Sequence, residues 1–395
     1  MKASNRIRTL TGTGDDGWGL FLRARAMKAA GEPVLELTIG EHDIATDPRI
    51  LAAMTASARG GHTGYAAVPG IPALRDAVAA RLTERTGVPT SRDNVLITPG
   101  GQAGLFAAHH AACDEGDRAL LIDPYYASYP GTIRGVGAVP VPVQAAPEDG
   151  FQPRETALAA AAPGAKSLLI NSPNNPTGVV YTPETLAGIA RVACDRGLWL
   201  ISDEVYDTQV WQGAHISPRA LPGMAARTLV VGSLSKSHAM TGSRLGWVVG
   251  PSEVIAHMIT LATHTTYGVP GYIQDAGLHA LGLGVEFEAG IAAPFLRRRE
   301  IILTLLAGQQ AVRAVPAQGA MYAMLDIRST GLSGEEFAAR VLEAEKIAVM
   351  PGESFGAAAA GHIRVALTLP DDQFGEAASR LIRFANLCAA RRGAE

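Results

Sequence analysis

The chain has 395 residues and a formal net charge of −3, so it carries no basic field that would attract nucleic acid or anionic lipid. Hydrophobic residues make up 47% and charged residues 18%, a balance that is typical of a folded globular enzyme and excludes extensive disorder. Because one hydrophobic core rarely supports this length, we expect two domains, or one large α/β domain with an appendage, around a deep cleft.

The cysteines and the apolar runs of the chain indicate the cellular compartment in which the protein is expected. Cys113, Cys194 and Cys388 show neither paired nor CxxC spacing, which predicts no disulfide framework and no metal site. The first residues lack a long apolar core, and no apolar run elsewhere is long enough to span a bilayer. We therefore expect a cytoplasmic protein that binds neither membrane nor nucleic acid.

Residues 1–45 are predicted to form an arm. A glycine- and aspartate-rich stretch at 11–19 leads into a helical pattern at 18–30 and a short apolar strand at 34–39. Gly40 ends that strand, where a missing Cβ would let the backbone approach a ligand closely, although an ordinary turn glycine is the simpler explanation.

A pattern of strand, glycine turn and helix begins at Val95. The apolar run at 95–98 is followed by Gly100, Gly101 and Gln102 and then by a helix predicted over 103–113. Backbone N–H groups at such a helix start bind anions. The spacing matches neither the dinucleotide fingerprint nor the nucleotide-binding loop, so a phosphate monoester is the better ligand.

The central region alternates strands with helical or loop segments, and this alternation predicts a largely parallel α/β sheet with site residues at the carboxyl ends of its strands. The further strands are expected at 119–122, 138–143, 167–170, 198–201 and 228–231. Several of these runs end in polar or aromatic residues. Tyr126 suits ring stacking or core packing, Asn175 a ligand or its own turn, and Asp203 is a carboxylate that needs a partner.

The stretch 232–246 places Lys236 on a predicted loop between two apolar strands at the edge of the sheet. Hydroxyl donors and a forked cation surround it, and these are groups that hold a phosphate: Ser233, Ser235 and Arg244. A lysine beside a phosphate site suggests a Schiff base with pyridoxal phosphate. A solvated loop lysine explains this stretch alone equally well.

The last third of the chain predicts a second domain. Helices are expected at 252–263, 272–281, 285–306, 334–345 and 371–390, and strands at 321–325, 347–349 and 363–367. Arg364 lies inside the last of these strands, where a buried guanidinium is costly without an anion. A substrate carboxylate would supply that anion, and an internal salt bridge is the alternative.

Together these residues resemble the class I/II aminotransferases of pyridoxal-phosphate fold type I, from about residue 37 to residue 367. Three motifs carry the resemblance in the family's order: Asn175-Pro176-Thr177-Gly178, Ser202-Asp203-Glu204-Val205-Tyr206, and Ser233-x-Ser235-Lys236 followed by Arg244. The resemblance implies an α/β fold with a mainly parallel seven-stranded sheet in a large domain, at 46–285. It also implies a small α+β domain formed by both termini, from residues 1–45 and 286–395.

The resemblance further implies roles for single residues. Lys236 would bind the cofactor covalently, Asp203 would face the pyridine nitrogen, and Tyr206 would contact the ring oxygen and complete the catalytic set. The implied cofactor-binding residues are Tyr65, Gly100, Gly101, Gln102, Tyr126, Asn175, Asp203, Tyr206, Ser233, Ser235, Lys236 and Arg244. The implied substrate-binding residues are Gly40, Tyr126, Asn175 and Arg364. Because Tyr65 matches a tyrosine that reaches the neighbouring subunit's phosphate, a homodimer with shared sites is expected.

Within the family, the segments 233–242 and 361–364 resemble the bacterial arginine:pyruvate transaminases, which implies arginine or another long polar amino acid as donor and a 2-oxo acid such as pyruvate as acceptor. His42 and Ser243 depart from the proline and tryptophan that relatives usually carry. Candidates for donor selection are Trp18, Glu41, His42, Asp43 and Tyr267. An aspartate- or aromatic-type aminotransferase, a carbon–sulfur β-lyase and, less favoured, a non-catalytic sensor are the alternatives.

Overall fold

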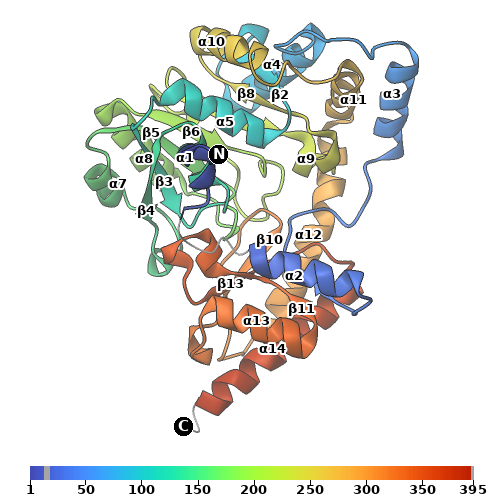
Figure 1. Cartoon of the computed structure of the whole chain (residues 1–395), viewed down its shortest axis with the longest axis vertical. Helices are drawn as coiled ribbons and strands as arrows, with labels where there is room; N and C mark the ends of the chain where they lie inside the picture. The colour runs from blue at the N-terminus through green and yellow to red at the C-terminus, as the bar shows by residue number, and fades with distance from the viewer. Residues whose placement is uncertain (13–17, 393–395) are drawn as a thin grey trace.

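The protein is described by a computed structural model that covers residues 1–12 and 18–392. A large domain at the top of Figure 1 is built on a seven-stranded sheet with the order β2-β8-β7-β6-β5-β3-β4. Only β8 runs antiparallel to its neighbours. The strands are β2 (Val95–Thr98), β3 (Arg118–Asp123), β4 (Val139–Gln144), β5 (Ala165–Asn171), β6 (Trp199–Asp203), β7 (Thr228–Ser233) and β8 (Gly246–Val249).

The central strands are apolar along their length because helices cover both faces of the sheet. Leu168 and Leu200 pack into one core, whereas their chain neighbours Leu169 and Ile201 pack into another on the opposite face. The helices of this domain are α3 (Pro48–Arg59), α4 (Pro72–Thr86), α5 (Gly101–Ala112), α6 (Tyr129–Gly135), α7 (Glu155–Ala161), α8 (Pro183–Arg196), α9 (Leu234–Ser237), α10 (Ser252–Thr263) and α11 (Gly271–Leu281). A sheet covered in this way leaves its strand ends as the place for a site.

Both ends of the chain contribute to the small domain, at the bottom of Figure 1. Near the N-terminus, β1 (Leu35–Glu36) pairs in parallel with β11 (Ile347–Ala348). The four-stranded sheet has the order β12 (Met350–Pro351), β13 (His362–Ala366), β10 (Tyr322–Asp326) and β9 (Arg313–Ala314). Its helices are α2 (Trp18–Ala29), α13 (Gly334–Glu345) and α14 (Asp371–Arg392), α12 (Gly284–Leu306) joins it to the large domain, and α1 (Asn5–Arg8) lies against α6.

The predicted fold is confirmed, including the seven-stranded sheet and the small domain formed by both termini. The strand predicted over 34–39 is shorter, because only Leu35 and Glu36 pair with β11 before the chain turns toward Gly40. The strand predicted over 347–349 is replaced by β11 and β12, which pair in different sheets. The arm predicted over 11–19 falls partly on residues 13–17, outside the described residues. The boundaries at 45/46 and 285/286 stay predictions.

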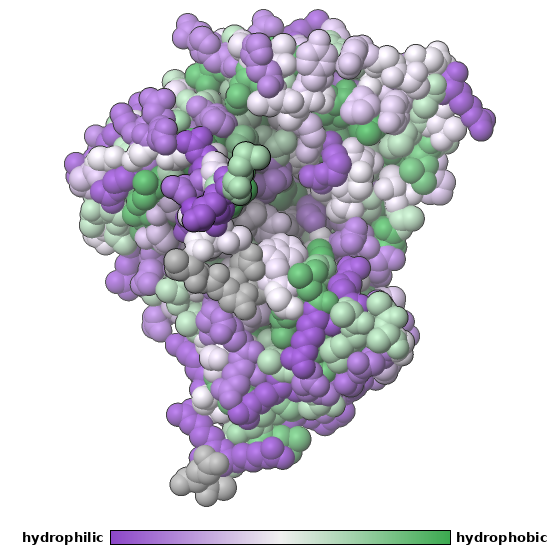
Figure 2. All heavy atoms as spheres, in the orientation of Figure 1, coloured by the Kyte–Doolittle hydropathy of each residue, from purple (hydrophilic) through white to green (hydrophobic). Residues whose placement is uncertain are grey.

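Hydrophilic residues are spread over both domains on the face seen in Figure 2, with smaller groups of apolar residues between them. None of the helices in the described part of the chain is long and apolar enough to cross a membrane.

Candidate active site

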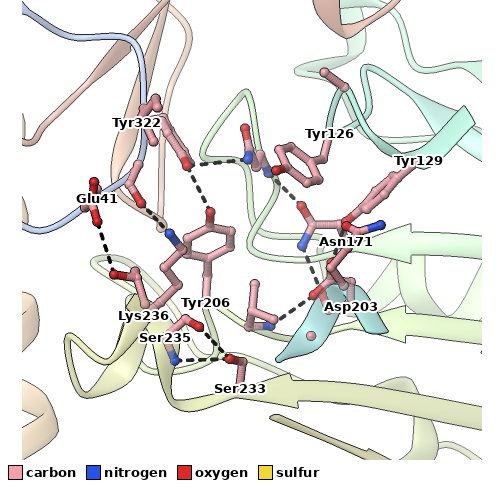
Figure 3. A pocket seen from close by; sticks show the side chains of 18 of the residues that line it. Glu41, Tyr126, Tyr129, Asn171, Asp203, Tyr206, Ser233, Ser235, Lys236 and Tyr322 are labelled. Carbon is pink, nitrogen blue, oxygen red and sulfur yellow. Dashed lines mark hydrogen bonds between the residues drawn. The ribbon is translucent and has the colours of Figure 1, made fainter. Parts of the chain in front are cut away.

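A cavity of about 300 Å³ lies at the carboxyl ends of β5, β6 and β7, and the small domain closes its other side. Figure 3 shows side chains from distant parts of the chain that converge on it. The cavity brings together most of the site residues predicted from the sequence: Gly40, Gly101, Gln102, Tyr126, Asn175, Asp203, Tyr206, Ser233, Ser235, Lys236, Arg244 and Arg364. Gly100 adjoins it through Arg244, and Tyr65 does not line it.

Lys236 lies on the single-turn helix α9 that follows β7, so the prediction of a loop was wrong. The helix forms there because the Ser233 hydroxyl caps it and accepts a hydrogen bond of 3.1 Å from the Ser235 backbone N–H. The Lys236 amine donates to the carbonyl oxygen of Gly40 (Figure 3). Burial lowers the pKa of Lys236, because the charged ammonium form is desolvated. The amine can therefore become neutral more easily than a surface lysine.

Asp203 ends β6 and is only 4% exposed. Its carboxylate accepts hydrogen bonds from the Tyr129 hydroxyl at 2.6 Å and from the Val205 backbone N–H at 3.3 Å. Burial raises the pKa of Asp203 to about 6, and these hydrogen bonds offset only part of the effect. No cationic side chain among the described residues forms an ion pair with it. A ligand with a protonated ring nitrogen would supply the missing positive charge.

The other end of the cavity suits a phosphate. Helix α5 begins at Gly101, so its unpaired backbone N–H groups face the site beside Arg244. A Cβ on Gly100 (φ +81°) would lie 2.5 Å from an Arg244 nitrogen, so only glycine lets the guanidinium come this close. The Ser233 hydroxyl donates its one proton to Ser235 Oγ at 2.9 Å or to the Leu245 carbonyl at 3.0 Å, so Ser235 is the hydroxyl that can donate to a phosphate.

The Gln102 side chain is held by two hydroxyls. Its Nε2 donates to Thr132 Oγ1 at 2.6 Å, and its Oε1 accepts from the Ser128 hydroxyl at 3.0 Å. The backbone N–H of Gln102 and the second N–H of its Nε2 remain available to a phosphate. A reactive lysine, a buried unpaired carboxylate and an anion cup together fit pyridoxal phosphate, which has an aldehyde, a basic ring nitrogen and a phosphate.

Arg364, on β13, is buried on the small-domain side of the cavity. Its guanidinium lies between the rings of Tyr322 and Phe355, with 4.4 Å from Cζ to each ring centroid. It donates to Asn175 Oδ1 at 2.8 Å and to a backbone carbonyl, while its Nε is buried without a partner. No carboxylate among the described residues pairs with it, so the alternative of an internal salt bridge is wrong. An unpaired N–H of this kind suits a carboxylate ligand.

Tyr322 is a lining residue that the sequence did not reveal. Its hydroxyl lies 3.0 Å from the hydroxyl of Tyr206 and 3.5 Å from the Asn175 amide nitrogen. A Cβ on Gly40 would come within 1.9 Å of the same oxygen, which explains the glycine better than the turn alone does.

The candidates for donor selection fall into two groups. Trp18 and Glu41 line the cavity. His42 does not, because its ring packs on Phe295 and its Nε2 lies 3.0 Å from the Lys236 carbonyl oxygen. Asp43 was a wrong candidate, because its carboxylate accepts two hydrogen bonds, of 3.0 and 2.7 Å, from the buried guanidinium of Arg298.

Tyr65 and Tyr267 lie on the surface of this chain. Tyr65 is 92% exposed and its ring meets that of Tyr267 edge to face, with centroids 5.2 Å apart. Neither ring lines the cavity of its own chain, and the role of Tyr267 in donor selection stays a prediction.

Fold and site together define a pyridoxal-phosphate-dependent enzyme of amino acid metabolism. A profile of the family "aminotransferase class I and II" matches residues 32–381. The chain belongs to this family and is a pyridoxal-phosphate-dependent aminotransferase, whose substrates are amino acids and 2-oxo acids.

Individual relatives cover almost the whole chain. An arginine–pyruvate transaminase from Pseudomonas aeruginosa is 38% identical, over 99% of this chain and 98% of that protein. An aspartate aminotransferase from Streptomyces avermitilis is 36% identical, over 91% of each chain. The structure of the Thermus thermophilus aspartate aminotransferase with maleate has a TM-score of 0.91 and 33% identity, and it covers 97% of this chain and all of that one.

Proposed function

We propose that the enzyme transfers the amino group of arginine, or of another amino acid with a long cationic side chain, to pyruvate. The observation that carries this proposal is Glu41, an exposed carboxylate that lines the cavity. Its Oε1 accepts a bond of 3.3 Å from the Thr241 hydroxyl, and it forms no ion pair with any described residue. A guanidinium can donate two hydrogen bonds to such a carboxylate. The similarity to the Pseudomonas arginine–pyruvate transaminase supports the same donor.

Aspartate is the second candidate donor, because several relatives are named as aspartate aminotransferases. A donor with a second carboxylate needs a second cation in the outer cavity. The cationic side chains that line the cavity are Lys236, Arg244 and Arg364. In our assignment these serve the cofactor's aldehyde carbon, the phosphate and the α-carboxylate, which leaves no lining cation in the described residues for a side-chain carboxylate.

The catalytic assignments follow from charge and position. Pyridoxal phosphate, when bound, supplies an aldehyde that takes up the donor's amino group and a ring that withdraws electrons from the donor's Cα. Asp203 would keep the ring nitrogen protonated, because a buried ion pair favours both charged forms. Lys236, whose pKa is lowered by burial, would accept the Cα proton as a neutral amine and deliver it, as the general acid, to the cofactor carbon that bore the aldehyde. Tyr206 and Asn175 would donate hydrogen bonds to the ring oxygen.

Substrate orientation is assigned to Arg364 and Gly40. The stacked guanidinium would bind the α-carboxylate through its unpaired Nε–H and a second N–H, which fixes the direction of the Cα–H bond. Holding reactants in this way contributes up to about 7–11 kcal/mol in favourable cases. The absence of a Cβ at Gly40 leaves room for the Tyr322 hydroxyl, which would lie beside the carboxylate.

The assembly we propose is a homodimer with shared active sites. Tyr65 is supported as a contributor to the partner's phosphate site by its exposure and by its absence from its own chain's cavity. A single measurement of molar mass by light scattering tests the dimer, and a monomer would contradict it. We also propose a cytoplasmic location, which the three free thiols support.

The donor is tested by a half-reaction screen of the twenty common amino acids with the loaded enzyme and no acceptor, followed through the absorbance of the bound cofactor. Arginine should have the largest ratio of rate to dissociation constant, and pyruvate should restore the starting spectrum with formation of alanine. A clear preference for aspartate or glutamate would overturn the cationic donor and leave the aminotransferase assignment in place.

A further inference from the structure

Asp123, the last residue of β3, is a buried carboxylate outside the catalytic set. It is 2% exposed, does not line the cavity, and forms no ion pair with any described residue. Burial raises the pKa of Asp123 to about 6 even though backbone N–H groups stabilise its charged form. A buried carboxylate without a cation is costly, so its contacts need an explanation.

Those contacts cross from the large domain to the small domain. The Ala357 N–H donates to Asp123 Oδ2 at 3.0 Å, and the Ala358 N–H lies 3.2 and 3.3 Å from the two carboxylate oxygens. A Cβ on Gly356 (φ +116°) would lie 2.1 Å from Oδ1, so a glycine is required for this approach. The carboxylate thus holds the segment 352–359, which precedes β13 and meets the large domain in Figure 1.

The same segment contains Phe355, one of the two aromatic residues that contact the Arg364 guanidinium. Phe355 is 1% exposed, and its carbonyl oxygen accepts a bond of 2.9 Å from the Tyr125 N–H, two residues after Asp123. Its ring lies on the Arg364 guanidinium opposite Tyr322. Anchors on both sides of Gly356 therefore fix the ring that orients the arginine.

We infer that Asp123 is a positioning residue for the substrate carboxylate: it ties the segment 352–359 to the large domain and so keeps Phe355 stacked on Arg364. Asp123 touches neither the cofactor site nor the reacting atoms, so its effect falls on substrate binding rather than on the chemical step. The inference rests on the proposed role of Arg364.

The test measures L-alanine half-reactions by stopped-flow absorbance, because L-alanine probes only groups common to all amino acids. Asp123→Asn puts an N–H₂ group among backbone donors, and we expect the dissociation constant of L-alanine to rise about 10-fold. The limiting rate should stay within roughly twofold, a split that loss of folded enzyme would not produce. Asp117→Asn is the matched control, because Asp117 caps a turn at the other end of β3, where its Oδ2 accepts from Asp114 N–H at 2.9 Å.

Three further single variants and one double variant separate the possible failures. Phe355→Leu should raise the same constant, and the double variant should show no more than the larger single effect, because both changes act through one contact. If Asp123→Asn does not fold, Gly356→Ala displaces the segment with the carboxylate intact and should reproduce the binding defect. Unchanged binding, or effects of Asp123→Asn and Phe355→Leu that add, would overturn the inference. If Arg364→Lys binds L-alanine normally, the proposed role of Arg364 fails instead, and the inference fails with it.

Discussion

The Tyr129 hydroxyl donates a 2.6 Å hydrogen bond to the Asp203 carboxylate, and both side chains are buried. Tyr129 begins α6 and Asp203 ends β6, so the contact joins two elements on the large-domain side of the cavity (Figure 3). A neutral donor orients the carboxylate without neutralising it. The negative charge of Asp203 therefore stays available to a positively charged ring.

We predict that Asp203→Asn retains the cofactor and loses transamination. The phosphate-binding groups at the start of α5 are unchanged, while the ring nitrogen loses its counter-charge. The single-turnover rate with L-alanine should fall roughly 10²–10³-fold, the range seen when one preorganised electrostatic contact is removed. Cofactor content is measured by absorbance after gel filtration. A variant that keeps both the cofactor and the full rate would contradict this role of Asp203.

Tyr129→Phe should have a smaller effect in the same assay. Removal of the hydroxyl takes away a hydrogen bond that stabilises the ionised carboxylate, so the pKa of Asp203 rises further and its charge falls. We expect a loss of about 10-fold in the limiting rate, with the cofactor retained. Tyr125→Phe is the control, since Tyr125 forms no hydrogen bond with Asp203. An equal loss in both variants would show that only packing was disturbed.

Glu41→Gln should lower kcat/KM for arginine about 10-fold and leave kcat/KM for alanine unchanged, because only the arginine side chain gains charge-assisted hydrogen bonds from the carboxylate. The value for arginine is measured in steady state with pyruvate as acceptor. The value for alanine is measured with a short 2-oxo acid other than pyruvate.

Asp43→Asn is the comparison for Glu41→Gln. Because the buried Arg298 keeps its pairing with Asp371, loss of the Asp43 carboxylate should lower the free energy of unfolding by about 1–3 kcal/mol without changing the ratio of arginine to alanine activity. If the ratio moves with Asp43 and not with Glu41, the proposed donor contact is wrong.

Because His109 is buried, we expect the protein to lose stability as the pH falls. It is fully buried on α5, neither ring nitrogen has a hydrogen-bond partner, and burial lowers its pKa from 6.5 to about 4. Between these values the unfolded chain binds the proton and the folded chain does not, so stability is complete above pH 6.5 and falls as the pH drops. Relative to His109→Leu, the wild type should lose about 2 kcal/mol between about pH 7.5 and pH 5 in urea unfolding. Parallel pH profiles would contradict the buried neutral imidazole.

The sequence predicted those elements whose pattern is local. The bounds of β2, α10 and α13 match the predicted ranges, because each is an apolar or amphipathic run between clear turn signals. Helix α8 was not singled out, although Thr182 and Pro183 mark its start and Gly197 its end. The single turn of α9 is too short to give a periodic signal, so Lys236 was expected on a loop.

Contacts between distant residues could not be predicted. Tyr322 reaches Tyr206 only through the meeting of the two domains, and the pairing of Asp43 with Arg298 joins residues far apart in the chain. Asp203 and Arg364 were recognisable in advance because a charge at the end of, or inside, an apolar strand is costly without a partner. That argument identifies the residue as part of a site but does not identify its binding partner.

The assignment of Lys236 is tested most directly by borohydride reduction of the cofactor-loaded enzyme, followed by proteolysis and mass spectrometry of the labelled peptide. We predict one label per chain, on Lys236, and none in Lys236→Ala loaded with the same cofactor. A label on any other lysine of the wild-type chain, such as Lys166 or Lys346, would contradict the account.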